Sequence, residues 1–317
     1  MYVQKTIKKQ VSCSGIGLHT GNPVNMTFKP AAINSGILFK RMDLDGHPIL
    51  KIHARNIGDL SYATTVGAGE AAIKTIEHVL SAMHALGVTN VLIELDSNEA
   101  PVLDGSSSCF IKMLLDAGLT AQNAMNKLIR IQHPIEVRVK DTIISVEPYD
   151  GLKMTYTIDF SNPFIGTQTK TFELTPQGYI DDIMRARTFC LYEEIEYLWK
   201  MGLSKGGSLD NAVVFAQDRI LNDSLRYDDE PVRHKILDLV GDLAFLGHPL
   251  LGHIKVYKGG HLLHAKFVKE IFAKPECWTY LVDRKLSPTF YQEDGDHADL
   301  FTIPKITQSS SNPQIFV

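Results

Sequence analysis

The sequence lacks the features that mark several classes of protein. It contains no run of about 18 uninterrupted apolar residues, so no transmembrane segment is expected. The lysines near the N-terminus precede no apolar run of signal-peptide length, and the predicted location is the cytoplasm. Lys and Arg number 32 against 36 Asp and Glu, which leaves a net charge of −4. Without a basic excess, no nucleic-acid partner is expected.

Cysteine is also scarce. The four cysteines are widely separated, which gives neither a CxxC metal pair nor the density of a disulfide scaffold, and reduced thiols are expected. Histidine, by contrast, occurs twelve times. A bound metal would therefore be ligated by imidazole and carboxylate groups.

The two halves of the chain show the same order of predicted elements. Short alternating strands come first, over residues 24–54 and again over 128–160, where an Asp-Gly pair at 150–151 predicts a hairpin turn. A helix ended by glycine follows, over 71–86 and over 233–246. One more strand and a final helix complete each half.

This order predicts an α+β protein of two similar domains. Each domain is expected to be a layered β-sheet with helices, and the pair to pack as a duplicated α/β sandwich with the active site between the domains. The length of 317 residues also favours two domains over one. The first is assigned to residues 1–124 and the second to 125–275, joined near the polar stretch 122–127. Residues 276–317 form a C-terminal extension without an assigned role.

The segment RHKILDLVGDLAFLG, from Arg233, is the most informative. His234 and Asp238 are four residues apart, so on a helix they emerge from successive turns of one face and can bind one zinc ion. Asp242 lies one turn further. The alternative is a solvated acidic face with an exposed histidine. The apolar residues around these positions favour the ligand interpretation, because unpaired charges on a buried helix are costly.

A second segment, TIEHVLSAMHALG, places Glu77 beside His78 in an otherwise apolar helix. The pattern is similar to HExxH, but Ala82 occupies the second histidine position, so this helix supplies one ligand. A zinc ion held by His78, His234 and Asp238 would keep one coordination position open, as hydrolysis requires.

Two further histidines are candidates. His261 follows two glycines in YKGGH and starts a predicted helix, where it can face a cleft or make only a local hydrogen bond. His19 lies among glycines in SGIGLHTG, in a tight loop at a site or in a simple hairpin. The apolar stretch 188–205 can line a groove or form an ordinary amphipathic helix.

Taken together, these segments resemble in order and spacing the family of UDP-3-O-acyl-N-acetylglucosamine deacetylase, the zinc amidase that commits bacteria to lipid A synthesis. The resemblance covers about residues 1–272. The segments that carry it are SGIGLHTG (14–21), TIEH (75–78), LDGSSSCF (103–110), RTF (187–189), LSKGGS (203–208), VRHKILDLVGDLAFLG (232–247) and YKGGH (257–261).

The resemblance implies zinc-dependent hydrolysis of the N-acetyl group of UDP-3-O-acyl-N-acetylglucosamine, which gives UDP-3-O-acyl-glucosamine and acetate. It implies one Zn²⁺ per chain, bound by His78, His234 and Asp238. This small molecule is the expected partner, and a monomer is expected. The alternatives are another zinc amidohydrolase or peptidase, and a non-catalytic sugar-nucleotide binding protein.

The resemblance also assigns roles to other residues. Glu77 matches the general base, and His261, with Asp242 behind it, matches the group that acts as acid or stabilises developing charge. Thr188 matches a residue that hydrogen-bonds the oxyanion. The positions expected to contact the sugar nucleotide or its acyl chain are Lys235, Lys258, Phe160, His19, Phe189, Leu191 and Ile195.

Overall fold

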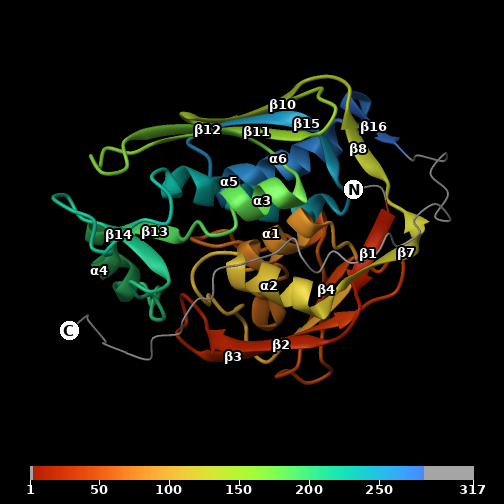
Figure 1. Ribbon diagram of the computed structural model, residues 1–317, viewed down its shortest axis with the longest axis horizontal. Coiled ribbons are helices and arrows are strands. Elements are labelled where there is room, and N and C mark those ends of the chain that lie inside the picture. The colour runs from red at the N-terminus through yellow and green to blue at the C-terminus, as the bar shows by residue number, and fades with distance from the viewer. Residues whose placement is uncertain (1–2, 282–317) are drawn as a thin grey trace.

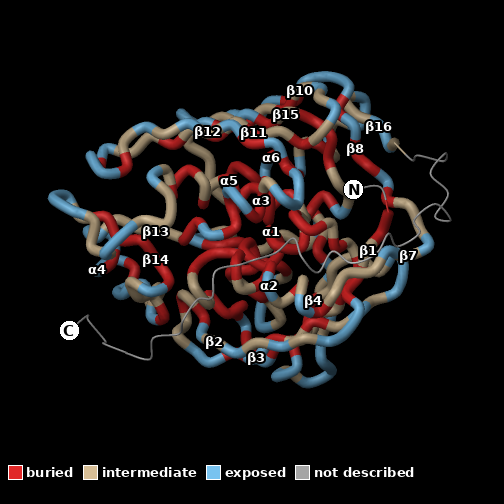
Figure 2. Tube along the Cα trace, in the orientation of Figure 1, coloured by how far each residue is buried: buried red, intermediate tan, exposed pale blue. Residues whose placement is uncertain are grey.

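The described part of the chain is built in layers. The computed structural model describes residues 3–281, and most of the expected C-terminal extension lies outside this range. Figure 1 shows a β-sheet on each outer side of the molecule and α-helices between the sheets. In Figure 2 the buried residues gather in these middle helices and on the strands next to them. The fold is therefore of the expected mixed α+β class.

The first sheet comes from the N-terminal half and has the strand order β2-β3-β6-β4-β5. Its strands are β2 (Val11–Ile16), β3 (Pro23–Pro30), β4 (Ile37–Arg41), β5 (Ile49–Lys51) and β6 (Val91–Leu95). β4 runs parallel to β6, and the other pairs are antiparallel. Val24, Met26 and Phe28 of β3 are buried, because alternate side chains of a strand point to the same face.

The second sheet comes from the C-terminal half and has the same order and directions along β9-β10-β15-β11-β12. β8 and β16 extend it to seven strands, so the start of the expected extension belongs to this sheet. The strands are β8 (Leu128–Ile131), β9 (Ile135–Val139), β10 (Thr142–Glu147), β11 (Leu152–Asp159), β12 (Thr167–Glu173), β15 (Leu250–Tyr257) and β16 (Trp278–Leu281).

Two short strand pairs complete the β-structure of residues 3–281. β1 (Val3–Ile7) is antiparallel to β7 (Leu119–Met125), and β13 (Thr188–Leu191) is parallel to β14 (Ala212–Phe215). β7 covers much of the polar stretch in which the domains were expected to join, so this stretch is largely a strand. The domain boundaries themselves stay a prediction.

The helices α1 and α5 meet at the centre of the molecule. The α-helices are α1 (Glu77–Leu86), α2 (Ser108–Ala117), α3 (Pro176–Asp182), α4 (Tyr192–Lys200), α5 (Glu230–Asp242) and α6 (His261–Ala273), and the 3-10 turns are Ala54–Asn56, Gly69–Ala71, Leu243–Leu246 and Pro275–Cys277. A Cβ atom added to Gly241 would lie 2.2 Å from the carbonyl oxygen of Glu77. Only glycine therefore permits this close approach, which brings the two helices that carry the candidate ligands together.

Gly87 ends a helix as expected, whereas the second α-helix already ends at Asp242 and Gly247 ends the 3-10 turn after it. Gly87 follows α1 and Gly247 follows the 3-10 turn after α5, and each has a φ of 70°. This left-handed conformation costs glycine little, because it has no Cβ atom.

The predicted hairpin at Asp150–Gly151 is wrong. β15 lies between β10 and β11 and pairs with both, so these two consecutive strands are not neighbours. The Asp-Gly pair instead crosses the end of β15, where the amide of Gly252 donates to the carbonyl of Gly151 at 2.8 Å. A strand from 100 residues further along the chain decides the pairing, which a local turn signal does not reveal.

The helix expected over 71–86 is shorter than predicted and begins at Glu77. Before it, the amide of Ile73 donates to the carbonyl of Val66 at 3.0 Å, and Thr75 has a φ of 56°. Ile73 and Ile76 are therefore buried from an irregular segment that bridges to Val66, and not from a helix.

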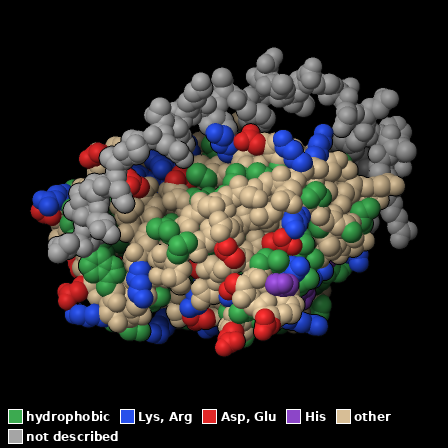
Figure 3. Space-filling model, turned by 90° about the horizontal axis from the view of Figure 1, so that it is seen from below, with side chains coloured by type: hydrophobic (Ala, Val, Ile, Leu, Met, Phe, Trp, Pro, Cys, Tyr) green, Lys and Arg blue, Asp and Glu red, His purple; other side chains and the backbone are tan. Residues whose placement is uncertain are grey.

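The outer surface carries mixed charge on the face shown in Figure 3. Acidic and basic side chains are interspersed there, in keeping with the small net charge. Among residues 3–281, the helices are all too short or too polar to cross a bilayer.

Candidate active site

The three candidate metal ligands meet in the core. His78 comes from α1, and His234 and Asp238 come from successive turns of α5. One ligand atom from each lies within 4.8 Å of the others, and the two imidazole centroids are 5.0 Å apart. All three residues are at most 3% exposed. The structure thus brings His78 together with two residues that come more than 150 positions later in the sequence.

Two ligand atoms of this cluster, Asp238 Oδ1 and His234 Nε2, face each other in the core. Asp238 Oδ2 accepts a hydrogen bond from Lys235 Nζ at 2.9 Å, but buried Oδ1 has no hydrogen-bond partner among the described residues. His234 Nδ1 contacts the carbonyl oxygen of Ala186 at 3.0 Å, which leaves Nε2 directed toward Asp238, 3.2 Å from Oδ1. Buried oxygens rarely lack a partner, and a ligating histidine usually donates its other ring nitrogen to a carbonyl. The cluster therefore fits a metal such as zinc.

Burial also sets the protonation states that a metal requires. Burial and the neighbouring His234 lower the pKa of His78 to about 3, so its imidazole is neutral. Burial opposes ionisation of Asp238, but His234 and Lys235 hold the pKa of this carboxyl well below its usual value. A neutral imidazole and an ionised carboxylate are the forms that bind metal.

Glu77 lies beside this cluster at the start of α1. The amide of Thr64 donates to its Oε2 at 3.0 Å, and His261 Nε2 is 3.9 Å from its Oε1. Burial, together with the charges of Asp238 and Asp242, raises the pKa of Glu77 to about 7 although His261 opposes the shift. A carboxyl with this pKa can exchange a proton near neutral pH, as a general base must.

A second cluster contains Asp242, His261 and His264. Both imidazoles place Nδ1 on Asp242 Oδ2, at 2.9 Å for His261 and 2.8 Å for His264. Thr64 Oγ1 donates to Asp242 Oδ1 at 2.6 Å, and Tyr156 Oη is 3.0 Å from His264 Nε2. Both oxygens of the Asp242 carboxylate therefore accept hydrogen bonds, whereas only Oδ2 of Asp238 does within residues 3–281.

This second cluster favours the protonated form of His261. Burial alone would lower the pKa of His261, but the adjoining carboxylate of Asp242 raises it to about 9. His261 is then protonated at neutral pH, with Nε2 directed toward Glu77. In contrast, burial lowers the pKa of His264, which can remain neutral between Asp242 and Tyr156.

A cavity of about 150 Å³ lies between residues of β13 and α4 and the segment around His19. Four residues predicted to contact the substrate or its oxyanion line it: His19, Thr188, Phe189 and Ile195. Leu191 is half-buried against the core and is not among the lining residues. His19 is 6% exposed, and its ring nitrogens make no hydrogen bond within residues 3–281. The stretch 188–205 thus forms both an amphipathic helix and one wall of a cavity.

The predicted aromatic contacts form a row that leads to the ligand cluster. The ring of Phe189 lies 5.6 Å from that of Phe160 and 6.5 Å from that of His234. Lys235 Nζ lies 5.6 Å from the centroid of the Phe189 ring. Lys258 directly follows β15, is partly exposed and forms an ion pair with Asp159 at 3.0 Å.

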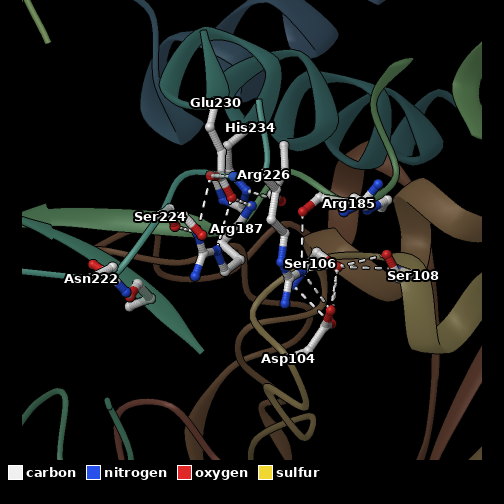
Figure 4. Close-up of polar contacts among 12 residues, drawn as sticks. Asp104, Ser106, Ser108, Arg185, Arg187, Asn222, Ser224, Arg226, Glu230 and His234 are labelled. Atoms are coloured by element: carbon white, nitrogen blue, oxygen red, sulfur yellow. Dashed lines mark hydrogen bonds and ion pairs between the residues drawn. The ribbon is translucent and has the colours of Figure 1, made fainter. Parts of the chain in front are cut away.

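The sequence interpretation missed several residues of the site. His264 is three residues after His261 on α6, so helical spacing could have placed both on one face. Thr64 lies in an irregular segment with no signal. Figure 4 shows a further buried network beside His234, in which Arg187 and Glu230 form an ion pair with a distance of 2.9 Å.

Comparisons with known proteins agree with this geometry. Residues 4–273 match the family model described as LpxC, UDP-3-O-acyl N-acetylglycosamine deacetylase. A UDP-3-O-acyl-N-acetylglucosamine deacetylase of Saccharophagus degradans is 42% identical over 298 residues, which are 92% of this chain and 98% of the relative. That of Idiomarina loihiensis is 40% identical over 313 residues, 97% and 99% of the two chains. That of Bdellovibrio bacteriovorus is 43% identical over 282 residues, 89% and 93%.

Proposed function

Because the chain belongs to the family of UDP-3-O-acyl-N-acetylglucosamine deacetylases, we propose that the buried cluster of His78, His234 and Asp238 is its catalytic centre. The enzyme is a hydrolase that removes the N-acetyl group in lipid A biosynthesis. The observation that carries the assignment of the centre is the convergence of two imidazoles and one carboxylate in the core, where buried Oδ1 of Asp238 accepts no hydrogen bond within residues 3–281 and faces His234 Nε2. An oxygen left in this state is costly unless a cation binds it.

The family is zinc-dependent, and this donor set of two imidazoles and one carboxylate suits zinc. One Zn²⁺ per chain is proposed, held by His78, His234 and Asp238. When bound, zinc supplies Lewis acidity toward an amide carbonyl and toward a water molecule. Lys235 and the carbonyl of Ala186 orient two of these ligands through their hydrogen bonds.

Glu77 is proposed as the general base. Its pKa of about 7 lets it accept a proton from water at neutral pH, and the amide of Thr64 holds one of its oxygens in place. The hydroxide equivalent then adds to the acetyl carbon. Thr188, in the wall of the adjoining cavity, is proposed to donate a hydrogen bond to the developing oxyanion.

His261 is proposed as the general acid. As the C–N bond breaks, its Nε2 proton passes to the leaving nitrogen, so that acetate and a free amine are formed. The carboxylate of Asp242 accepts from His261 Nδ1 at 2.9 Å and stabilises the charged imidazole before this transfer. Between about pH 7 and about pH 9, Glu77 is ionised and His261 is protonated, so both groups are in the form that the mechanism needs.

The cavity beside α4 is proposed to take the 3-O-acyl chain. Its walls include the apolar side chains of Phe189, Ile195 and Leu198. The row from Phe160 to Lys235, together with His19 and Lys258, is proposed to contact the sugar nucleotide. Leu191 packs against the core and is proposed to support the cavity wall next to Cys190 without lining the cavity itself.

The common strand order of the two sheets supports a duplicated sandwich. In both halves a parallel pair lies between antiparallel pairs, and the central helices α1 and α5 occupy equivalent places before β6 and β15. The site would then lie between two related domains. The cytoplasmic location and the monomeric state stay predictions.

The function is tested by measuring zinc content and acetate release together. Purified protein is expected to hold one zinc per chain and to release acetate from UDP-3-O-acyl-N-acetylglucosamine. UDP-N-acetylglucosamine without the acyl chain is the matched substrate control, and it should react far more slowly because it leaves the cavity empty. Equal rates for the two substrates would contradict the role of the cavity, and protein without zinc would contradict the metal centre.

A further inference from the structure

Glu230, the first residue of α5, is a buried charge that no step of the reaction uses. It is 0% exposed. Its Oε1 accepts from the amide and from Nε of Arg187, both at 2.9 Å. Its Oε2 accepts from Arg187 Nη2 at 3.1 Å and from the amide of Arg226 at 2.7 Å (Figure 4). The carboxylate thus binds two backbone amides as well as a guanidinium, which is more than charge compensation requires.

These bonds complete a closed ring, which runs from Glu230 through the backbone of Arg187 and Ala186 to His234 and back along α5. Glu230 and His234 are one turn apart on α5, and their side chains lie next to each other in Figure 4. Glu230 holds the amide of Arg187, and the preceding carbonyl, that of Ala186, contacts His234 Nδ1 at 3.0 Å. The position of this carbonyl relative to α5 therefore depends on Glu230. The carbonyl in turn directs His234 Nε2 toward the ligand cluster.

Further hydrogen bonds hold the rest of the segment 185–188. Arg226 Nη1 donates to the carbonyl of Arg185 at 3.1 Å and to Asp104 Oδ2 at 2.7 Å. The amide of Thr188 donates to the carbonyl of Gly105 at 2.8 Å. Each of the four residues therefore has a backbone group held by a neighbouring element, and Thr188 enters the cavity wall from a fixed position.

We propose that Glu230 and Arg187 are positioning residues of the reaction, and that their buried ion pair orients His234 for metal binding and Thr188 for the substrate. The inference rests on the proposed function of the site. A merely structural ion pair contributes little net stability, since burial of the charges costs about as much as their attraction returns. What distinguishes this pair is that its hydrogen bonds end on the backbone next to a ligand and next to Thr188.

The test is Glu230→Gln, read out as zinc affinity and as separate kcat and KM values. The amide keeps the size of the side chain but loses its charge and two acceptor positions. Loss of an outer-sphere partner typically weakens metal binding by about 10–100-fold, and we expect a loss of that size in competition of the protein with a chelator for zinc. We expect kcat to fall by a similar factor, with little change in KM.

Asp229→Asn is the matched control, because Asp229 is the adjacent residue and forms ion pairs with Arg233 and Lys170 but has no bond to residues 185–188. Its zinc affinity and kcat should match those of the unaltered protein, even where its thermal midpoint falls. Folded Glu230→Gln protein with unchanged zinc affinity and kcat would overturn the proposal.

If Glu230→Gln does not fold, the zinc affinity of Arg187→Lys tests the proposal instead. Lysine keeps the charge and the backbone hydrogen bond but cannot reach both Glu230 and the carbonyl of Ser224, which Arg187 Nη2 contacts at 2.9 Å. We expect zinc affinity to fall about tenfold, at the lower end of the same range. Unchanged affinity in this variant would overturn the proposal. An unaltered protein without zinc and activity would instead refute the proposed function of the site.

Discussion

Two clusters, each of two histidines and one aspartate, lie next to each other along α5. The first contains Asp238 and the second contains Asp242, one helical turn away. In both, three ligand atoms lie within 4.8 Å of one another. In the first cluster, however, Asp238 Oδ1 has no hydrogen-bond partner in the described part of the chain. In the second, Thr64 and both histidines occupy the oxygens of Asp242.

The residue types of a cluster and the distances between them therefore do not by themselves identify a metal site. A cation needs lone pairs that no proton already occupies. The first cluster offers them, whereas the second uses its lone pairs to hold protons on two imidazoles. This contrast supports the proposal that the first cluster binds the metal and the second transfers the proton, and the predictions below test this division.

The largest effect is expected for the first cluster. His78→Ala removes one of three ligands, so zinc should be lost from the purified protein and acetate release should fall to the background of the assay. His84→Gln is the matched control: His84 lies on the same helix, but its Nδ1 contacts the carbonyl of Val240 at 2.9 Å, outside the site. Zinc retained at full stoichiometry in His78→Ala would remove this residue from the ligand set.

Glu77→Gln should separate metal binding from proton transfer. The amide cannot accept a proton, and loss of a general base typically costs about 10²–10⁴-fold in rate. Because Glu77 is not assigned as a ligand, zinc content should stay at one per chain. Metal analysis and acetate release on the same sample check both statements, and a fully active variant would exclude Glu77 as the base.

Asp242→Asn should change the pH dependence of the reaction. Asp242 raises the pKa of His261 to about 9, and the proposed mechanism needs His261 protonated, so activity should fall as pH rises through about 9. Without the carboxylate the pKa of His261 falls, and this basic limb should move to lower pH while zinc is retained. A profile of kcat against pH measures the shift. A limb that stays in place would mean that another group titrates there.

His264→Leu should have the smallest effect on the reaction and a measurable effect on stability. It leaves the hydroxyl of Tyr156 and one lone pair of Asp242 without a partner in the core. Such losses cost about 1–3 kcal/mol in the free energy of unfolding. Denaturant unfolding measures this change, and zinc content should not change. Loss of zinc in this variant would show that the two clusters are not separate.

The sequence predicted the parts of the site that lie on helices. His234, Asp238 and Asp242 follow helical spacing in an apolar segment, and Glu77 and His78 begin a buried helix, so their relation was visible in local pattern. The helix end at Gly87 was visible for the same reason.

Features that depend on distant contacts could not be predicted in this way. The Asp150–Gly151 pair predicts a hairpin, but β15, from much later in the chain, lies between β10 and β11. Thr64 reaches Asp242 from an irregular segment, and the ring through Glu230 and Ala186 involves backbone groups that carry no sequence signal. Satisfaction of hydrogen bonds, which separates the two clusters, appears only in three dimensions.

The division between the clusters is tested most directly by the zinc content of Asp238→Asn and Asp242→Asn after dialysis against the same chelator. Both changes are isosteric, and they lie one turn apart on the same buried helix. The account predicts that Asp238→Asn loses its zinc under conditions in which Asp242→Asn and the unaltered protein each keep one equivalent. Equal retention, or loss of zinc from Asp242→Asn alone, would contradict it.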